Sequence, residues 1–404
     1  MTSWIEVSEQ RLAANYRAIE EAVGEETAVL GVIKANAYGH GAEHCAVVLA
    51  RAGAKWLGVT TAEEGARVRQ ALRNAGFASE TQPRILIMCA FRPEDVAAIK
   101  EHALTPVVWT AEQVAWLKGS GVAVHVEIDT GMARQGLHPG AELDAVLREL
   151  TAAGLALDGV FTHFCASEVA HSELTQTQER KFEAAISQVR DAGLKLRWVH
   201  AGSSSSVDNP AQKSPWLVNL AKSVGALAMV RCGCALYGYC VEIEQHKDIA
   251  SPTGSDTVES MLRKTLLPVM TWKTRVASVR ELAAGESVGY NAIFTAKKPM
   301  RLAMIPVGYA DGLRRGLSGS DERSGGWVML RGRDGLGEQT EPSAPYRAAI
   351  VGRISMNLTM VDITDLADVR IGDEAVVLGD GITADDHARL AGTIPYEILC
   401  AVRA

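Results

Sequence analysis

Eight short apolar segments, separated by amphipathic helical patterns, occupy residues 1–243 and constrain the fold most strongly. Each segment is almost continuously apolar, which is typical of strands in a parallel sheet covered on both faces. The segments are residues 28–33, 56–59, 85–88, 104–108, 122–128, 157–162, 196–200 and 227–230. The helical patterns include residues 62–75, 93–102, 111–118, 141–153 and 176–192. An open doubly wound sheet shows the same alternation, but the count of eight favours a closed (β/α)8 barrel.

The pattern changes after residue 243. Residues 244–260 are polar and contain proline and glycine, which is typical of a linker. Residues 261–404 have strand patterns separated by glycine-rich turns and one clear helical pattern at 384–391, and residues 316–345 are predicted to be a long surface excursion. The predicted strands are 267–282, 302–307, 348–351, 358–363 and 374–378. We therefore predict an α/β chain: a TIM-like barrel, whose first residues could pair with the second domain, followed by a mostly β C-terminal domain.

Composition excludes several classes of partner. The chain of 404 residues has a formal net charge of −7, so it offers no basic surface for nucleic acid. No segment approaches the roughly 20 apolar residues of a membrane-spanning helix, and the sequence does not open with a secretory signal. Seven cysteines, an odd number, favour reduced thiols over a disulfide framework. We expect a cytoplasmic protein with no nucleic-acid or membrane partner.

Polar residues collect at the carboxyl ends of the predicted barrel strands, where barrel enzymes place their active sites. The main ones are Lys34, Arg134, His163, Ser204 and Arg231. A lysine that ends a buried strand is desolvated, which favours the neutral, nucleophilic amine used in Schiff-base chemistry. The loops after the last two strands carry serine hydroxyls and a glycine, which suit a phosphate. The sequence therefore predicts an active site at this end of the barrel.

Of two other interpretations of this region, the residues argue against a kinase and leave a zinc peptidase as the weaker alternative. Lys34 follows Val-Ile as a kinase lysine does, but no glycine-rich loop precedes it and the other kinase signatures are missing. His40, Glu43 and His44 match the H-x-x-E-H pattern of a zinc peptidase, although Gly41 suits a turn and no third ligand is evident.

Residues 32–41, Val-Ile-Lys-Ala-Asn-Ala-Tyr-Gly-His-Gly, resemble the cofactor-lysine motif of the alanine racemases. Seven further segments resemble motifs of that family in the same order and spacing, over essentially the whole chain. These are residues 128–134, 161–164, 230–238, 285–290, 307–312, 352–356 and 396–397. The resemblance implies a fold type III enzyme that uses pyridoxal 5'-phosphate and racemises a small amino acid.

The resemblance also implies roles for single residues. Lys34 would hold the cofactor as a Schiff base and act as a base on one face of the substrate, with Tyr290 as the base on the other face. Arg134 and the backbone N–H of Met356 would bind the substrate carboxylate. His163 would lie against the cofactor ring. The residues implied to hold the cofactor phosphate are Tyr38, Ser204, Gly233, Cys234 and Tyr396.

Arg231 would face the pyridine nitrogen. An arginine there does not give up its proton, so the nitrogen stays unprotonated and the cofactor is a weaker electron sink, which disfavours transamination. The implied reaction is the interconversion of L-alanine and D-alanine for peptidoglycan synthesis. The alternative is a racemase that acts on serine or on a broader range of amino acids. Pyridoxal-phosphate decarboxylases also combine a barrel with a β-rich domain, but the presence of Tyr290 together with Arg231 argues against a decarboxylase.

The family resemblance further implies an obligate head-to-tail homodimer, in which Tyr290 acts in the partner's site. Four positions depart from the family pattern, one of them Cys232, which replaces a common proline. Glu127 stands where many members have a carbamylated lysine, and we hypothesise that its own negative charge orients Arg134. Asn357 replaces a usual aspartate, and Ser203 replaces a usual asparagine.

Overall fold

The chain forms two compact units in the computed structural model, which describes residues 2–212, 215–245, 257–258, 260, 262–330, 345–366 and 368–403. One unit consists of Glu9–Ala37 and Gly41–Leu267. The other consists of Met1–Ser8, Tyr38–His40 and Pro268–Ala404. The predicted linker at 244–260 lies largely outside the described residues.

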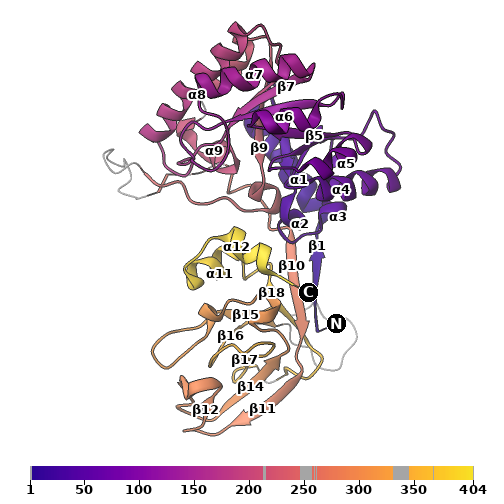
Figure 1. The fold of residues 1–404 in the computed structure, drawn as a ribbon. Coiled ribbons are helices and arrows are strands. Elements are labelled where there is room, and N and C mark those ends of the chain that lie inside the picture. The colour runs from indigo at the N-terminus through magenta and orange to yellow at the C-terminus, as the bar shows by residue number, and fades with distance from the viewer. Residues whose placement is uncertain are drawn as a thin grey trace. The chain divides into compact units, whose positions relative to one another are not determined.

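The first unit contains a closed barrel of eight parallel strands, β2 to β9 in order, which confirms the predicted barrel (Figure 1). Strand β2 pairs with β9 and closes the barrel, with Leu30 opposite Arg231. The strands are β2 (Thr27–Val32), β3 (Trp56–Val59), β4 (Arg84–Ile87), β5 (Leu104–Val108), β6 (Ala123–Ile128), β7 (Ala156–Thr162), β8 (Trp198–His200) and β9 (Leu227–Cys232).

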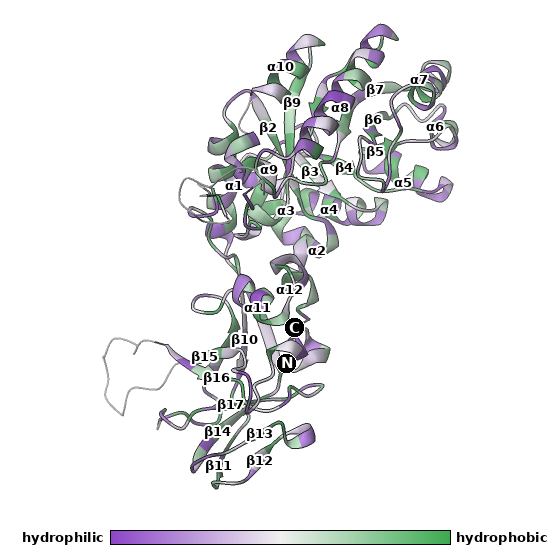
Figure 2. Cartoon of the chain, turned by 90° about the vertical axis from the view of Figure 1, so that its left-hand side faces the viewer, coloured by the Kyte–Doolittle hydropathy of each residue, from purple (hydrophilic) through white to green (hydrophobic). Residues whose placement is uncertain are grey.

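Amphipathic helices surround the barrel, and strands such as β9 are coloured as hydrophobic in Figure 2. Helix α1 buries Leu12, Tyr16 and Ile19. The helices are α1 (Glu9–Val23), α3 (Ala42–Arg51), α4 (Ala62–Asn74), α5 (Val96–Glu101), α6 (Ala111–Leu117), α7 (Ala141–Ala153), α8 (Glu173–Asp191), α9 (Ser204–Asp208) and α10 (Trp216–Ser223). Helix α8 begins three residues before the predicted start because the Ser172 hydroxyl caps it. No helix in the described ranges is long and apolar enough to cross a membrane.

The second unit is mostly β, as predicted. Its five-stranded sheet has the order β1 (Ser3–Val7), β10 (Met270–Arg275), β18 (Glu374–Leu378), β15 (Trp327–Leu330) and β16 (Tyr346–Ala349). A three-stranded sheet has the order β11 (Ser278–Leu282), β14 (Met300–Ile305) and β17 (Thr359–Asp362). Strands β12 (Ser287–Val288) and β13 (Phe294–Thr295) form a hairpin, and α11 (Ala384–Ala391) and α12 (Pro395–Ala401) follow the last strand. The first residues belong to this unit because β1 pairs with β10.

Two predictions for this unit are wrong. Residues 267–282 are not one strand, because the chain leaves the five-stranded sheet after β10 and joins the other sheet as β11. At the break, the Val276 N–H donates to the Asp373 carbonyl and the Ala277 N–H donates to the Met304 carbonyl. The supposed excursion at 316–345 contains β15, which lies between β18 and β16, while residues 331–344 lie outside the described residues.

Candidate active site

Lys34 lies at the carboxyl end of β2 and opens a turn, α2 (Lys34–Tyr38), of unusual conformation. The four residues after it have positive φ angles of 51°, 55°, 54° and 53°, although none of them is glycine. Left-handed backbone costs an L-residue roughly 1–2 kcal/mol. A run of four such residues persists only where neighbouring groups hold it, and strain of this kind is characteristic of functional sites.

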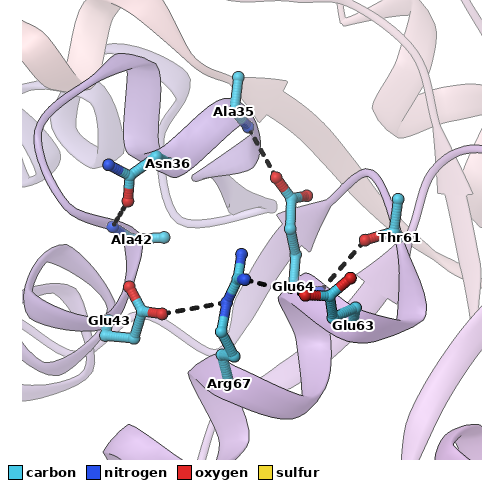
Figure 3. A network of polar contacts seen from close by, with 8 residues as sticks. All are labelled: Ala35, Asn36, Ala42, Glu43, Thr61, Glu63, Glu64 and Arg67. Atoms are coloured by element: carbon cyan, nitrogen blue, oxygen red, sulfur yellow. Dashed lines mark hydrogen bonds and ion pairs between the residues drawn. The ribbon is translucent and has the colours of Figure 1, made fainter. Parts of the chain in front are cut away.

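Side chains from helix α4 and from the turn itself hold this conformation (Figure 3). One carboxylate oxygen of Glu64 accepts the Ala35 N–H at 3.0 Å, and the other accepts the Thr60 N–H at 2.7 Å. The Asn36 side-chain oxygen accepts the Ala42 N–H at 3.0 Å, where α3 begins. Glu64 occupies the third position of α4, where a glutamate ordinarily caps its own helix. Here the capping carboxylate also fixes the turn that follows Lys34.

Arg231, on the strand paired with β2, is buried and held by three acceptors. One terminal nitrogen, Nη2, donates to the Thr162 carbonyl at 2.7 Å and lies 3.2 Å from His163 Nδ1. The other, Nη1, lies 3.2 Å from His200 Nδ1. The guanidinium also stacks over the Phe161 ring, 4.8 Å from its centre. The side chain is therefore fixed in one orientation.

His163 is a neutral imidazole. Burial, together with the positive charges of Arg231, Arg134 and Lys34, lowers the pKa of His163 to about 3. Its Nδ1 therefore accepts a hydrogen bond from Arg231. The barrel mouth thus brings together four of the five residues that the sequence analysis placed there: Lys34, Arg134, His163 and Arg231.

The loops after β8 and β9 also meet. Ser204 begins α9, and its hydroxyl oxygen accepts the N–H groups of Gly233 at 3.1 Å and Ala235 at 3.2 Å. Cys234 begins the adjoining 3-10 turn, whose Tyr237 hydroxyl donates to the Val32 carbonyl at 3.1 Å. Three of the five predicted phosphate-binding residues therefore lie together beside the end of β2.

Glu127 is buried at the end of β6, and burial raises the pKa of its carboxyl to about 7. A hydrogen bond from Gln135 and the charges of Arg231 and Arg134 oppose that rise. The direct partner of Glu127 is Gln135, whose amide nitrogen donates to the carboxylate and to the Met88 carbonyl. Arg134 is exposed and forms no hydrogen bond or ion pair with another described residue. Any influence of Glu127 on Arg134 therefore acts through Gln135 and through charge.

The remaining predicted residues belong to the β-rich unit. Tyr290 begins a 3-10 turn and is 64% exposed, and Met356 is 57% exposed. Among the described residues, the Met356 N–H has no acceptor. A cavity of about 730 Å³ beside the Tyr290 turn is lined by Arg315 and Arg353, among others. Both arginines could attract an anionic substrate.

Tyr38 and Tyr396 lie against each other within this unit. Their ring centres are 6.3 Å apart and their planes are nearly perpendicular, at 85°. This edge-to-face arrangement is the favourable geometry for two aromatic rings. The structure therefore joins the two tyrosines that the sequence assigned to the phosphate, although they are far apart along the chain.

The zinc-peptidase interpretation finds no support. Such a site needs both histidines on one helix, but His40 precedes α3 and Gly41 between them has a φ of 91°. Glu43 is paired with Arg67 at 3.2 Å, and His44 lies 3.4 Å from Glu9. In the part of the chain that the structure describes, no three His, Cys, Asp or Glu side chains could hold a metal ion.

Sequence reasoning missed a group of polar residues inside the barrel. His125 and Asp158 lie in strands that were interpreted only by their apolar character, and His200 was noted as a strand end without a role. One signal was present: His125 stands between two valines, so its side chain points to the opposite side of the sheet from theirs. A histidine inside a barrel needs hydrogen-bond partners, which could have prompted a search for them.

Comparisons with known proteins agree with this geometry. Residues 7–241 match the family model for the alanine racemase N-terminal domain, and residues 269–404 match that for the C-terminal domain. The chain is 32% identical over 408 residues to the alanine racemase of Methylacidiphilum infernorum (isolate V4), covering 98% of this chain and 89% of that protein.

Solved structures of similar proteins share the fold. The alanine racemase of the D-cycloserine producer Streptomyces lavendulae is 28% identical and has a TM-score of 0.78. The match covers 100% of this chain and 95% of the Streptomyces chain. The structure from Bartonella henselae, an alanine racemase with covalently bound pyridoxal phosphate, is 24% identical and has a TM-score of 0.76. The match covers 100% of this chain and 98% of the Bartonella chain. Both domains match over nearly their whole length, so the chain is an amino-acid racemase that belongs to the alanine racemase family.

Proposed function

We propose that this protein interconverts L-alanine and D-alanine with pyridoxal 5'-phosphate as cofactor, and that Lys34 and Tyr290 are its two bases. The observation that carries the proposal is the position of Lys34 beside Arg231 and His163 at the mouth of the barrel. The D-alanine produced would be used for bacterial peptidoglycan. The odd number of cysteines supports a cytoplasmic location.

The residues at the barrel mouth fit this cofactor, which presents an aldehyde, a pyridine nitrogen and a phosphate. Lys34 supplies an amine, and Arg231 supplies a fixed donor. The hydroxyl of Ser204 and the backbone at Gly233 and Cys234 suit a phosphate. Tyr38 and Tyr396, from the β-rich unit, would complete the set. When bound, pyridoxal phosphate supplies an electron sink that makes the α-proton of an amino acid removable.

Inversion at a carbon needs two groups that exchange protons on opposite faces. We assign the Lys34 amine to one face and the Tyr290 hydroxyl to the other. The exposed Arg134 guanidinium would bind the substrate carboxylate, and the Met356 N–H, which lacks an acceptor among the described residues, would assist it. These two groups would hold the α-carbon between the bases.

Arg231 supports racemisation over transamination. Burial lowers the pKa of Arg231 to about 10, while the nearby charge of Glu127 opposes the shift. The guanidinium therefore stays protonated at neutral pH and donates hydrogen bonds without releasing a proton. A donor of this kind would leave the ring nitrogen unprotonated, so charge would stay near the α-carbon.

The assembly is also part of the proposal. We infer a head-to-tail homodimer in which Tyr290 serves the site of the partner subunit. The high exposure of Tyr290 supports this, because a tyrosine that acts as a base needs a partner surface to exclude water from it.

The proposal is tested by incubating the purified holoenzyme with L-alanine in deuterated water. We expect D-alanine that carries deuterium at the α-carbon. Release of carbon dioxide would indicate decarboxylation, and pyruvate as the main product would indicate transamination, so either would refute the proposal. Faster exchange with L-serine than with L-alanine would refute the assignment of alanine as the substrate.

A further inference from the structure

A line of hydrogen-bonding groups runs through the interior of the barrel and ends at Arg231. Asp158 Oδ2 lies 3.2 Å from His125 Nε2. His125 Nδ1 lies 2.9 Å from His200 Nε2. His200 Nδ1 in turn lies 3.2 Å from Arg231 Nη1. Four side chains from strands β7, β6, β8 and β9 are thus joined by three contacts of hydrogen-bond length.

Water has little access to this line. The side chains of His125 and His200 are fully buried, and Arg231 is 6% exposed. Asp158, at the far end, is 14% exposed and forms an ion pair with Arg84 at 2.8 Å. Each buried polar atom therefore depends on its neighbour in the line, because a buried donor or acceptor without a partner destabilises the fold.

The two ends of the line determine where its protons lie. Asp158 can only accept: burial opposes ionisation, but the hydrogen bond from His125 and the charge of Arg84 lower the pKa of its carboxyl overall. Arg231 can only donate. Burial lowers the pKa of His125 and lowers that of His200 well below its usual range, so both rings are neutral.

A neutral imidazole has one donor and one acceptor, so the order of the line leaves a single arrangement. His125 donates from Nε2 to Asp158, which leaves its Nδ1 as an acceptor. His200 donates from Nε2 to that nitrogen, and its own Nδ1 accepts from Arg231. All three hydrogen bonds therefore run in the same direction, from Arg231 towards Asp158, and aligned bonds of this kind strengthen one another.

The packing around the two rings is specific. Gly159 faces the His125 ring so closely that a Cβ at this position would lie 2.6–2.8 Å from three ring atoms. The Phe161 ring stacks on His200, with centres 4.6 Å apart and planes 21° from parallel. The Trp56 ring lies 5.3 Å from His125. The barrel therefore holds both imidazoles in one orientation.

We propose that Asp158, His125 and His200 are positioning residues that orient Arg231 towards the cofactor ring. This inference rests on the proposed function. Of the five N–H groups of Arg231, one is directed to His200 and two to Thr162 and His163. Among the described residues the Nε–H and one Nη1–H have no acceptor, which leaves them for a ligand, so the line of histidines determines which edge of the guanidinium faces the site.

The first test measures the proton positions directly. In the full-length holoenzyme labelled with ¹⁵N-histidine, we expect His125 and His200 both to carry the proton on Nε2. We also expect neither ring to titrate between about pH 5 and pH 8, where an ordinary histidine does. A charged ring, or a proton on Nδ1 of either histidine, would overturn the proposal. This readout needs no catalysis, so it is independent of the substrate.

The second test replaces members of the line. His200→Leu and Asp158→Asn should lower kcat on the order of tenfold with KM unchanged, as loss of an outer hydrogen-bond partner does at other sites. Both should also shift the absorption band of the bound cofactor. His200→Gln should recover most of both effects, because its amide can accept from Arg231 and donate to His125. The matched control is Asp191→Asn, because the Asp191 carboxylate is exposed and paired with Arg190.

The outcomes separate this inference from the proposed function. A wild-type enzyme without a cofactor band, or without racemisation, refutes the proposed function. A normal wild-type enzyme in which Asp158→Asn matches Asp191→Asn in both kcat and absorption refutes the positioning role alone. Equal loss in His200→Leu and His200→Gln, seen only as a lower melting temperature with unchanged absorption, would also refute it by indicating a purely structural role.

Discussion

The turn after Lys34 offers a sharp test, because one carboxylate from another helix, that of Glu64, supports it directly in addition to the Asn36 side chain. Glu64→Gln keeps the size of the side chain but leaves one acceptor oxygen where there were two. The new amide N–H₂ group would face either the Ala35 N–H or the Thr60 N–H, and two donors cannot bond to each other. The left-handed residues 35–38 would then lose part of the support that offsets their strain.

The magnitude follows from the two contacts. A hydrogen bond to a charged group contributes roughly 1.5–3 kcal/mol. Ala35 is exposed, so water can replace much of its bond to Glu64, whereas Thr60 is half-buried and loses more. We therefore expect a loss of about 2 kcal/mol, which corresponds to about a 30-fold change in the equilibrium for local opening of the turn.

Amide hydrogen exchange of the peptide that contains residues 33–41 measures this equilibrium. Exchange should be faster in Glu64→Gln by the stated factor, and cofactor release should be faster too. Glu63→Gln is the matched control on the same turn of α4, because Glu63 is exposed and, within the described ranges, bonds only to Arg67 (Figure 3). Equal exchange in the two variants would show that Glu64 does not hold the turn.

Four further predictions concern Glu127, the shared site and the β-rich unit. Glu127 ionises only as the pH rises through about 7, so activity of Glu127→Gln should match wild type below about pH 5 and fall behind it above pH 7; an activity ratio independent of pH would refute this. The same raised pKa means that ionisation costs folding free energy, so Glu127→Gln should gain up to about 3 kcal/mol of stability relative to wild type as the pH rises from about 4.5 to 7. Co-expression of Lys34→Ala with Tyr290→Phe should restore about a quarter of wild-type activity, because hybrid dimers contain one intact site; no recovery would contradict a shared site. Gly308→Ala should destabilise the β-rich unit and weaken substrate binding, because its Cβ would lie 2.3 Å from the Met356 carbonyl oxygen, and an unchanged melting temperature would contradict this.

The barrel could be predicted because its strands are mostly apolar and its helices are amphipathic, and both patterns are local in sequence. The site at its mouth followed from topology, since the carboxyl ends of all eight strands meet at one end. The β-rich unit was harder. Strand β15 lies within a glycine-rich and charged segment, and its pairing with β18 and β16 depends on residues far away along the chain.

Two features of the site could not be predicted from sequence at all. Ala35 and Asn36 give no sign of left-handed backbone, because that conformation is imposed by Glu64 from a different helix. The line from Asp158 to Arg231 is assembled from four strands, and each histidine in isolation could equally be a satisfied core residue. Both features depend on contacts between segments, which no local pattern records.

The central claim is that Lys34 is the residue that binds pyridoxal phosphate. Reduction of the holoenzyme with borohydride, followed by proteolysis and mass spectrometry, tests it directly, because reduction makes the link between the amine and the cofactor permanent. We expect one modified peptide, with the pyridoxyl group on Lys34. Modification of a different lysine, or no modification in an enzyme that still racemises alanine, would contradict the account.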